Sequence, residues 1–222
     1  MKLLDLFCGA GGAAVGYNRA GFDDITGVDI VNQPRYPYKF IQADALEYLR
    51  EHGKEYDVIH ASPVCKGYSQ LSGLWQDREY PDDIPVLREL LIETGKPYVI
   101  ENVVGAPLKD YVMLCGSMFG LRVYRHRLFE CNPPILISPG ACNHWAKASG
   151  NNATINGKRV TPNLADFDIL TITGHDFILS DARIAMGIDW MQQSEISQAV
   201  PPAYTEWIGK QMIQVRIPSA HR

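Results

Sequence analysis

The sequence predicts an α/β fold in which helices cover a mostly parallel sheet. Short apolar runs alternate with helical segments from the first residues onward, and glycine, proline or an acidic residue follows several of the runs. Such runs are typical of buried parallel strands, and open α/β sheets bind ligands outside the carboxyl ends of their strands. The run 56–60 leads through Pro63 to Cys65, so we expect this thiol at that edge.

The composition indicates a single globular domain. The chain has 222 residues, of which 46% are hydrophobic and 21% charged, enough for a sizeable core. No window approaches the roughly 18 apolar residues of a membrane span, and Asp5 interrupts the apolar start that a signal peptide requires. We therefore expect a cytoplasmic protein that does not bind membranes. The five scattered cysteines favour reduced thiols over a disulfide framework.

The first element is predicted to be a strand over 2–7, followed by a glycine turn over 9–12 and a helix over about 13–20. In this arrangement the backbone can approach a ligand and the helix N-terminus offers free N–H groups. The glycine spacing differs from the Gly-x-Gly-x-x-Gly of dinucleotide sites. No Gly-Lys-Ser/Thr follows, which excludes a P-loop.

Two acidic residues stand where the next strands are expected to end. Asp29 follows the strand predicted over 25–28, and Asp44 follows the short run 38–41. Carboxylates at this edge bind ribose hydroxyls in α/β cofactor sites. Either residue could instead cap a helix, Asp44 in particular, because the amphipathic segment 45–49 follows it. Together with the glycine turn, the two acids suit an adenosine moiety better than a phosphate chain.

Cys65 is the candidate nucleophile. Lys66 beside it favours the thiolate, the reactive form of cysteine. The alternative is a small buried hydrophobic residue. The strand predicted over 98–100 ends in Glu101, so a carboxylate is expected at the same edge and suits acid–base work beside the thiol. A glutamate in a surface turn is the alternative for Glu101.

The second half of the chain changes character after two further expected strands, 112–114 and 128–131. Residues 131–180 are rich in proline, glycine and asparagine. Because this segment is longer than an ordinary connecting loop, we interpret it as a small inserted recognition region. Residues 1–130 would form the core, and helices within 181–222 would complete it.

The segment 118–160 carries six basic residues and one acidic residue, a local net charge of +5 in a chain whose formal net charge is -4. A basic segment is a candidate footprint for a polyanion, and a solvated loop is the alternative. Lys147, Lys158 and Arg159 are the candidate substrate contacts of the inserted region. Cys131, Cys142 and His144 suggest zinc, but their spacing is irregular and a fourth ligand is lacking, so we expect no metal.

Four motifs follow one another along the chain: Asp5-x-Phe7-x-Gly9-x-Gly11-Gly12, Pro63-x-Cys65, Glu101-Asn102-Val103 and Arg125-x-Arg127. In this order, and over nearly the whole length, the chain resembles the DNA cytosine-5 methyltransferases of the small bacterial and phage type. The resemblance implies a Rossmann-like class I methyltransferase core that binds S-adenosylmethionine (SAM) and releases S-adenosylhomocysteine.

The resemblance also implies the site residues. Those for the cofactor are Asp5, Phe7, Gly9, Gly11, Gly12, Asp29, Ile30, Asp44, Ala45 and Pro63. The catalytic residues are Cys65, Glu101, Arg127 and Arg125. Those near the substrate are Ser62, Lys66, Asn102 and Val103. The implied partner of this monomer is double-stranded DNA with a cytosine flipped out of the helix.

In the implied reaction, Cys65 attacks C6 of the cytosine, Glu101 holds N3 and the amino group, Arg127 contacts O2, and C5 accepts the methyl group. Val64 stands where the family has proline before the nucleophile, and Lys66 and Val123 replace two glutamines. These departures leave alternatives open: the same chemistry on RNA or a nucleotide, a modified SAM donor, or a catalytically impaired DNA-binding module.

Overall fold

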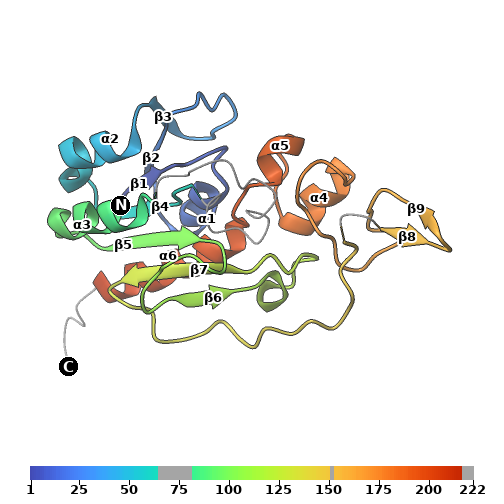
Figure 1. Ribbon diagram of the computed structural model, residues 1–222. Helices are drawn as coiled ribbons and strands as arrows, with labels where there is room; N and C mark the ends of the chain where they lie inside the picture. Colours follow the sequence, from blue (N-terminus) through green and yellow to red (C-terminus); the bar gives the residue numbers. More distant parts are fainter. Residues whose placement is uncertain (65–81, 151–152, 217–222) are drawn as a thin grey trace.

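The computed structural model describes residues 1–64, 82–150 and 153–216, and within them one seven-stranded sheet lies between two layers of helices (Figure 1). The strand order is β3-β2-β1-β4-β5-β7-β6, and β7 is antiparallel to both of its neighbours. This sheet confirms the predicted α/β fold. Its strands are β1 (Lys2–Leu6), β2 (Asp24–Asp29), β3 (Lys39–Gln42), β4 (Val58–Ala61), β5 (Tyr98–Asn102), β6 (Val112–Leu114) and β7 (Arg127–Asn132).

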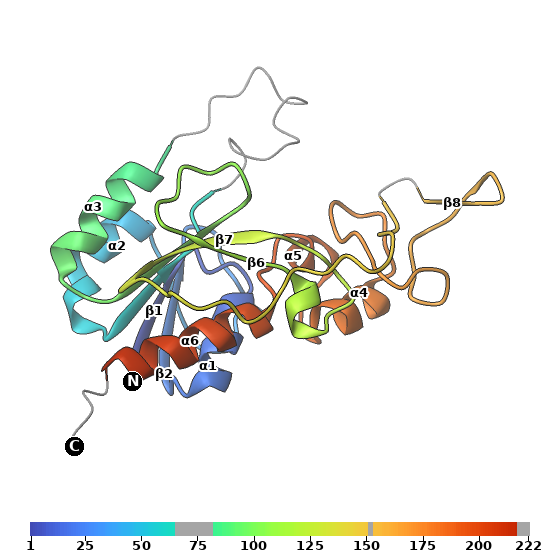
Figure 2. The same ribbon diagram turned by 90° about the horizontal axis from the view of Figure 1, so that it is seen from below.

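Helices cover both faces of the sheet because its strands are apolar on both sides. Helices α1 (Gly12–Ala20) and α6 (Pro202–Arg216) pack on one face, around Leu3 and Val99. Helices α2 (Ala45–His52) and α3 (Ile84–Thr94) pack on the other face, around Leu4 and Ile100. Figure 2 shows the two layers on opposite sides of the strands. Neighbouring residues of one strand thus enter different cores, as the alternation of a strand requires.

The closest contact between helices joins α1 to α6. A Cβ atom added to Gly16 would lie 2.1 Å from the carbonyl oxygen of Pro202, so only glycine allows this approach. Helix α1 ends at Gly21, which has a left-handed φ of 114°. A short 3₁₀ turn, η1 (Gly53–Glu55), joins α2 to β4. The packing of α1 against α6 therefore holds in place the turn between β1 and α1.

The inserted region begins after Asn132, the last residue of β7, and is largely irregular. It contains one hairpin, β8 (Thr154–Ile155) and β9 (Lys158–Arg159), at the end of the molecule away from α2 and α3 (Figures 1 and 2). Helices α4 (Leu179–Met186) and α5 (Gln193–Ile196) pack in a third apolar cluster with Leu170, Ile172 and Phe177 of the insert. Helix α6 thus packs on the sheet, whereas α4 and α5 pack with residues of the segment that follows β7. No helix within the described ranges is both long and apolar enough to cross a membrane.

Candidate active site

Most of the predicted cofactor and catalytic residues that the structure describes lie at one edge of the sheet. The parallel strands β1, β2, β4 and β5 all end there, whereas β7 runs the other way and begins there. The register pairs Asn102, the last residue of β5, with Leu128 of β7, so Arg127 lies beside the end of β5. This reversal explains how a residue 26 positions further along the chain than Glu101 reaches it.

The turn after β1 has a strained backbone. Phe7 has a φ of 55°, unusual for a residue with a side chain, and Gly9 has a φ of 48°. The N–H of Gly9 donates to Oδ2 of Asp29 at 3.0 Å, and the N–H of Val31 donates to Oδ1 at 2.9 Å. The carboxylate of Asp29 thus ties the end of β2 to the glycine turn and retains lone pairs for a ligand.

The three glycines of this turn have different surroundings. A Cβ atom on Gly12 would lie 2.4 Å from the carbonyl oxygen of Val200, and one on Gly11 would lie 2.7 Å from Cδ of Pro37. A Cβ atom on Gly9 would meet no atom within 4 Å. Gly11 and Gly12 are therefore required by packing, whereas Gly9 faces open space in which a ligand can approach the backbone.

Asp5 is a buried acid beneath the turn. It is 1% exposed; the Tyr36 hydroxyl donates to its Oδ2 at 3.1 Å, while Oδ1 has no hydrogen-bond partner among the described residues. Burial raises the pKa of Asp5 well above its ordinary value. The pKa of the neighbouring Cys8 thiol is also raised, by burial first and then by Asp5. A buried carboxyl oxygen without a partner is a candidate ligand contact.

Three further predicted cofactor residues lie near β2 and β3 and have different surroundings: Ile30, Asp44 and Ala45. Asp44 caps α2, because its Oδ1 accepts the N–H groups of Leu46 and Glu47, each at 2.9 Å. Capping, the alternative considered for Asp44, is therefore observed. Ala45 is buried in the core under α2, whereas Ile30 is 67% exposed directly after β2 and offers an apolar surface at the site.

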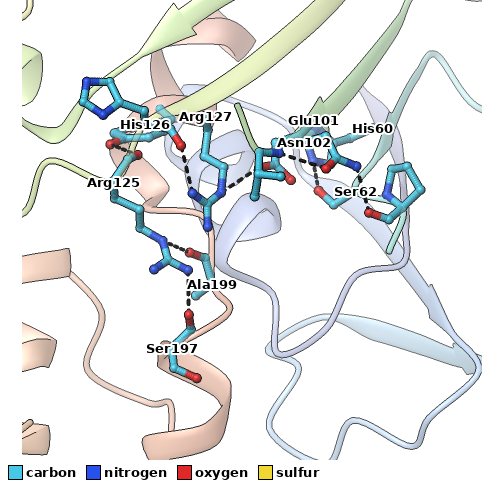
Figure 3. Close-up of polar contacts among 12 residues, drawn as sticks. His60, Ser62, Glu101, Asn102, Arg125, His126, Arg127, Ser197 and Ala199 are labelled. Atoms are coloured by element: carbon cyan, nitrogen blue, oxygen red, sulfur yellow. Dashed lines mark hydrogen bonds and ion pairs between the residues drawn. The ribbon is translucent and has the colours of Figure 1, made fainter. Parts of the chain in front are cut away.

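Glu101, which is buried, pairs with half-buried Arg127 at the end of β5 (Figure 3). Nε of Arg127 lies 3.1 Å from Oε1 of Glu101, although the angle is not that of a hydrogen bond and Oε1 has no hydrogen-bond partner among the described residues. Burial raises the pKa of Glu101, and the charge of Arg127, a hydrogen bond from Ser62 and the charge of Arg125 oppose it in part. The raised pKa favours the protonated acid, which can donate a hydrogen bond.

A polar chain that the sequence analysis did not identify supports Ser62. Nε2 of His60 lies 2.9 Å from the Ser62 hydroxyl, and Nδ1 lies 3.0 Å from the hydroxyl of Tyr17 on α1. His60 is fully buried, which lowers its pKa to about 3 and keeps the imidazole neutral. The local signal was a histidine two residues before Ser62 in an apolar strand, hence on the same face.

Asn102 holds the segment that precedes the predicted nucleophile. Its Nδ2 donates to the carbonyl oxygen of Pro63 at 3.1 Å, and its Oδ1 accepts the N–H of Val103 at 2.9 Å. Both polar ends of the side chain are thus engaged within the protein. Val64 is 44% exposed, and Cys65 and Lys66 lie outside the described residues.

Arg125 joins the insert to the segment between α5 and α6. It donates to the carbonyl oxygens of Ala199 at 2.7 Å, Ile172 at 2.9 Å and Ser197 at 2.9 Å (Figure 3). Arg125 has a positive φ of 36°, which turns the chain before β7. These contacts favour a positioning role for Arg125, while Arg127 is the arginine beside Glu101.

The basic residues of the insert lie on its outer part. Lys147, Lys158 and Arg159 are exposed, and the last two form β9 of the hairpin. Nη2 of Arg159 lies 2.7 Å from Oδ2 of Asp176, so part of the positive charge of Arg159 is balanced. Arg122, another contributor to the net charge of the segment, donates to the carbonyl oxygens of Asp168 and Phe167. The positive surface is therefore smaller than the sequence suggests.

The suggested zinc ligands are only partly brought together. Cys142 and His144 lie side by side, but Cys131 is buried in β7 and is not part of their cluster. Cys115 and His126 occupy the remaining positions instead.

Comparisons with known proteins agree with this fold. No protein-family model matches the chain. Its sequence is similar to two curated type II methyltransferases, M.AgeI of Thalassovita gelatinovora (31% identical over 122 residues) and M.FnuDI of Fusobacterium nucleatum (35% identical over 116 residues). Each match covers 47% of this chain, but 28% of M.AgeI and 33% of M.FnuDI. The chain thus spans about a third of the length of the curated relatives it matches.

Two solved structures match nearly the whole chain. One, described as a DNA modification methyltransferase encoded within an E. coli prophage, gives a TM-score of 0.57 at 16% identity and covers 96% of this chain and 99% of its own. The other, S. pombe Dnmt2 methyltransferase, gives a TM-score of 0.61 at 11% identity and covers 98% and 99%. The protein therefore has the Rossmann-like class I methyltransferase fold that the sequence predicted.

Proposed function

We propose that the protein binds SAM at the ends of β1 and β2 and transfers its methyl group to C5 of cytosine in DNA. The observation that carries the proposal is the pair of buried Glu101 and half-buried Arg127, which lies at the same sheet edge as the glycine turn and near Pro63. The similarity to type II methyltransferases and the order of the four sequence motifs support the same reaction class.

The residues at the first two strands fit SAM. The exposed backbone of Gly9 admits a ligand to the turn, and Asp29 presents lone pairs suited to the ribose hydroxyls. The unpartnered Oδ1 of Asp5 suits a hydrogen-bond donor of the cofactor, and exposed Ile30 suits one face of the adenine ring. When bound, SAM supplies a methyl group from its sulfonium sulfur.

The candidate reaction half of the site, at the ends of β4 and β5 and the start of β7, suits nucleophilic addition to cytosine. The Cys65 thiolate forms a bond to C6, and the electron pair of the C5–C6 double bond moves to C5, which then bonds to the methyl carbon. Glu101, whose protonated form is favoured because burial raises its pKa, donates to N3 and stabilises the charge that the addition creates. A base removes the C5 proton, the C5–C6 double bond re-forms, and the thiolate leaves.

Arg127 has two roles in this proposal. Its guanidinium holds the Glu101 side chain in place and presents N–H groups toward the substrate oxygen O2. Asn102, by binding the carbonyl of Pro63, positions the chain before the nucleophile. Ser62, supported by His60, fixes the other side of the Glu101 carboxyl.

DNA is the proposed substrate, bound by a monomer. Lys147, Lys158 and Arg159 would contact phosphates, because they are the exposed cations of the insert that the sequence analysis singled out. One observation favours a second candidate, an impaired module that binds DNA without methylating it: exposed Val64 replaces the proline that precedes the nucleophile in the family.

A mechanism-based trap tests the proposal. A duplex in which 5-fluorodeoxycytidine replaces deoxycytidine cannot lose a proton at C5 after methyl transfer, so the enzyme should remain covalently attached. We expect a SAM-dependent adduct that resists denaturation and maps to Cys65, and none with Cys65→Ala. Absence of an adduct, with SAM and DNA both bound, would favour the impaired module.

A further inference from the structure

Two cysteines and two histidines converge where the insert leaves the core. Cys115 follows β6, His126 precedes β7, and Cys142 and His144 lie in the irregular segment after β7. Their Sγ and ring nitrogen atoms all lie within 4.8 Å of one another. Three separate stretches of chain supply them, so no local turn accounts for the convergence.

The separations match those around a tetrahedral metal ion. Zn–S bonds of about 2.3 Å and Zn–N bonds of about 2.0 Å place sulfur and nitrogen ligands roughly 3.5 Å apart. Nε2 of His144 lies 3.2 Å from Sγ of Cys142 and 3.5 Å from Sγ of Cys115, and Nε2 of His126 lies 3.3 Å from Sγ of Cys142. One imidazole nitrogen facing two sulfurs, and one sulfur facing two imidazoles, fits a shared cation better than separate hydrogen bonds.

The cluster also has the outer contacts that orient metal ligands. The ring of Tyr124 stacks on His144, with centroids 3.9 Å apart and planes 21° apart. The Ser117 hydroxyl lies 3.1 Å from Sγ of Cys115 and accepts the N–H of Asn143 at 3.2 Å. Such contacts fix ligand orientation in metal sites.

We infer that Cys115, His126, Cys142 and His144 bind one structural zinc ion. Two thiolates and two imidazoles complete a four-coordinate shell, which leaves no open position for a substrate, so the role is structural and not catalytic. Zinc is favoured over harder cations because sulfur and imidazole are its preferred ligands.

The ion would connect the insert to the active site. It would fasten residues 142–144 to the core beside β6 and β7. It would also fix the backbone at His126, whose carbonyl oxygen accepts a hydrogen bond from Nη1 of Arg127 at 2.8 Å. Arg127 in turn lies beside Glu101. Loss of the ion should therefore loosen both the insert and the arginine of the reaction half.

The sequence analysis reached half of this ligand set and expected no metal. It considered Cys142 and His144, but with Cys131, whose thiol lies 3.9 Å from the carbonyl oxygen of Phe129 in β7. Cys115 and His126 lie 27 and 16 positions before Cys142, without the spacing of a zinc motif.

Metal analysis of the whole chain tests the inference. Protein purified under reducing conditions without chelator should contain one zinc ion per chain by inductively coupled plasma mass spectrometry. Cys142→Ser and His144→Asn should lower the zinc content at least tenfold. Cys131→Ala and His175→Asn, which remove a thiol and an imidazole outside the cluster, should leave it unchanged.

Cobalt gives a second readout that does not depend on how the variants fold. After chelation and readdition of Co²⁺ to the wild-type chain, tetrahedral coordination should produce visible ligand-field bands and a thiolate-to-cobalt charge-transfer band. Folded wild-type protein that holds no zinc and gives no cobalt bands would overturn the inference. Neither readout involves methyl transfer, so this test is independent of the proposed function.

Discussion

The two halves of the site at the sheet edge differ in the chemical groups that form them. At the ends of β1 and β2, the candidate cofactor half consists mainly of backbone: a left-handed turn at Gly9, its N–H group and the carboxylate of Asp29 that accepts it. At the ends of β4 and β5 and the start of β7, the candidate reaction half consists of polar side chains: Glu101 is buried, and Ser62 and Arg127 are half-buried beside it.

This difference predicts how each half fails. The glycine turn depends on its backbone conformation and on the one or two side chains that hold it. Loss of such a side chain should therefore weaken cofactor binding. The Glu101–Arg127 pair depends on each partner, because removal of one side chain leaves the other without the contact that holds it in place. Changes in the reaction half should therefore lower the rate strongly and leave cofactor affinity nearly unchanged.

The largest effect is expected for the nucleophile. Cys65→Ala should lower methyl transfer by about 10⁴-fold or more, since no other group can form the covalent intermediate. Isothermal titration calorimetry should show unchanged SAM affinity. Cys131→Ala serves as a matched thiol control. Turnover that survived Cys65→Ala would remove this residue from the mechanism.

Glu101→Gln should lower kcat by about 10²- to 10⁴-fold, because an amide cannot transfer a proton to N3. The pH profile sharpens the comparison. The pKa of Glu101 is raised and the protonated form is active, so the rate should fall as the pH rises through that pKa. Arg127→Ala removes a charge that lowers the pKa, so in that variant the fall should move to higher pH. If the rate fell at the same pH in wild type and in Arg127→Ala, titration of Glu101 would not be the cause of the fall.

In the cofactor half, Asp29 and Asp44 should behave differently. Asp29→Ala removes a charged acceptor of the turn and of the proposed ribose contact, and should weaken SAM binding by roughly 10- to 100-fold. Asp44→Ala removes the cap of α2 and should cost about 1 kcal/mol of stability, with little change in affinity. Calorimetry and thermal unfolding measure both effects. An equal loss of affinity in the two variants would instead place both carboxylates on the cofactor, as the sequence predicted.

His60 should affect stability more than chemistry. Its pKa is lowered to about 3, so the unfolded chain, with the ordinary value of 6.5, binds a proton that the folded chain does not. The stability carried by neutral His60 is therefore complete above about pH 6.5 and is lost as the pH falls toward 3, by up to about 1.4 kcal/mol per pH unit. His60→Gln should unfold in urea with a shallower dependence between pH 6 and 4. Parallel curves for the two proteins would contradict the assignment of a buried, neutral imidazole.

The sequence predicted the strands and the turn around the candidate cofactor half well because their signals are local. The strand expected over 25–28 is observed as Asp24–Asp29, and the glycine turn lies where a strand meets a helix. In the insert, Asn156-Gly157 was an unused hairpin signal: both residues have positive φ, 49° and 75°, as the β8–β9 turn requires.

Other features could not be predicted because they depend on tertiary contacts. His60 is explained by Tyr17, which approaches from α1 and not from the neighbouring sequence. Arg125 and Arg127 differ by two positions and were both expected to be catalytic. Arg125 binds backbone carbonyls of the insert and of the segment between α5 and α6, whereas Arg127 lies beside Glu101. Their contacts differ because of the path that the chain takes before and into β7, and the local sequence does not reveal that path.

Mass spectrometry of nucleosides from unmethylated DNA, incubated with the protein and SAM, tests the central claim most directly. Chromatography before detection separates 5-methyldeoxycytidine from its N4-methyl isomer and from N6-methyldeoxyadenosine. We predict 5-methyldeoxycytidine with wild type and none with Cys65→Ala. A methyl group found only on an exocyclic nitrogen, or unmodified DNA despite bound SAM, would contradict the proposed cytosine-5 chemistry.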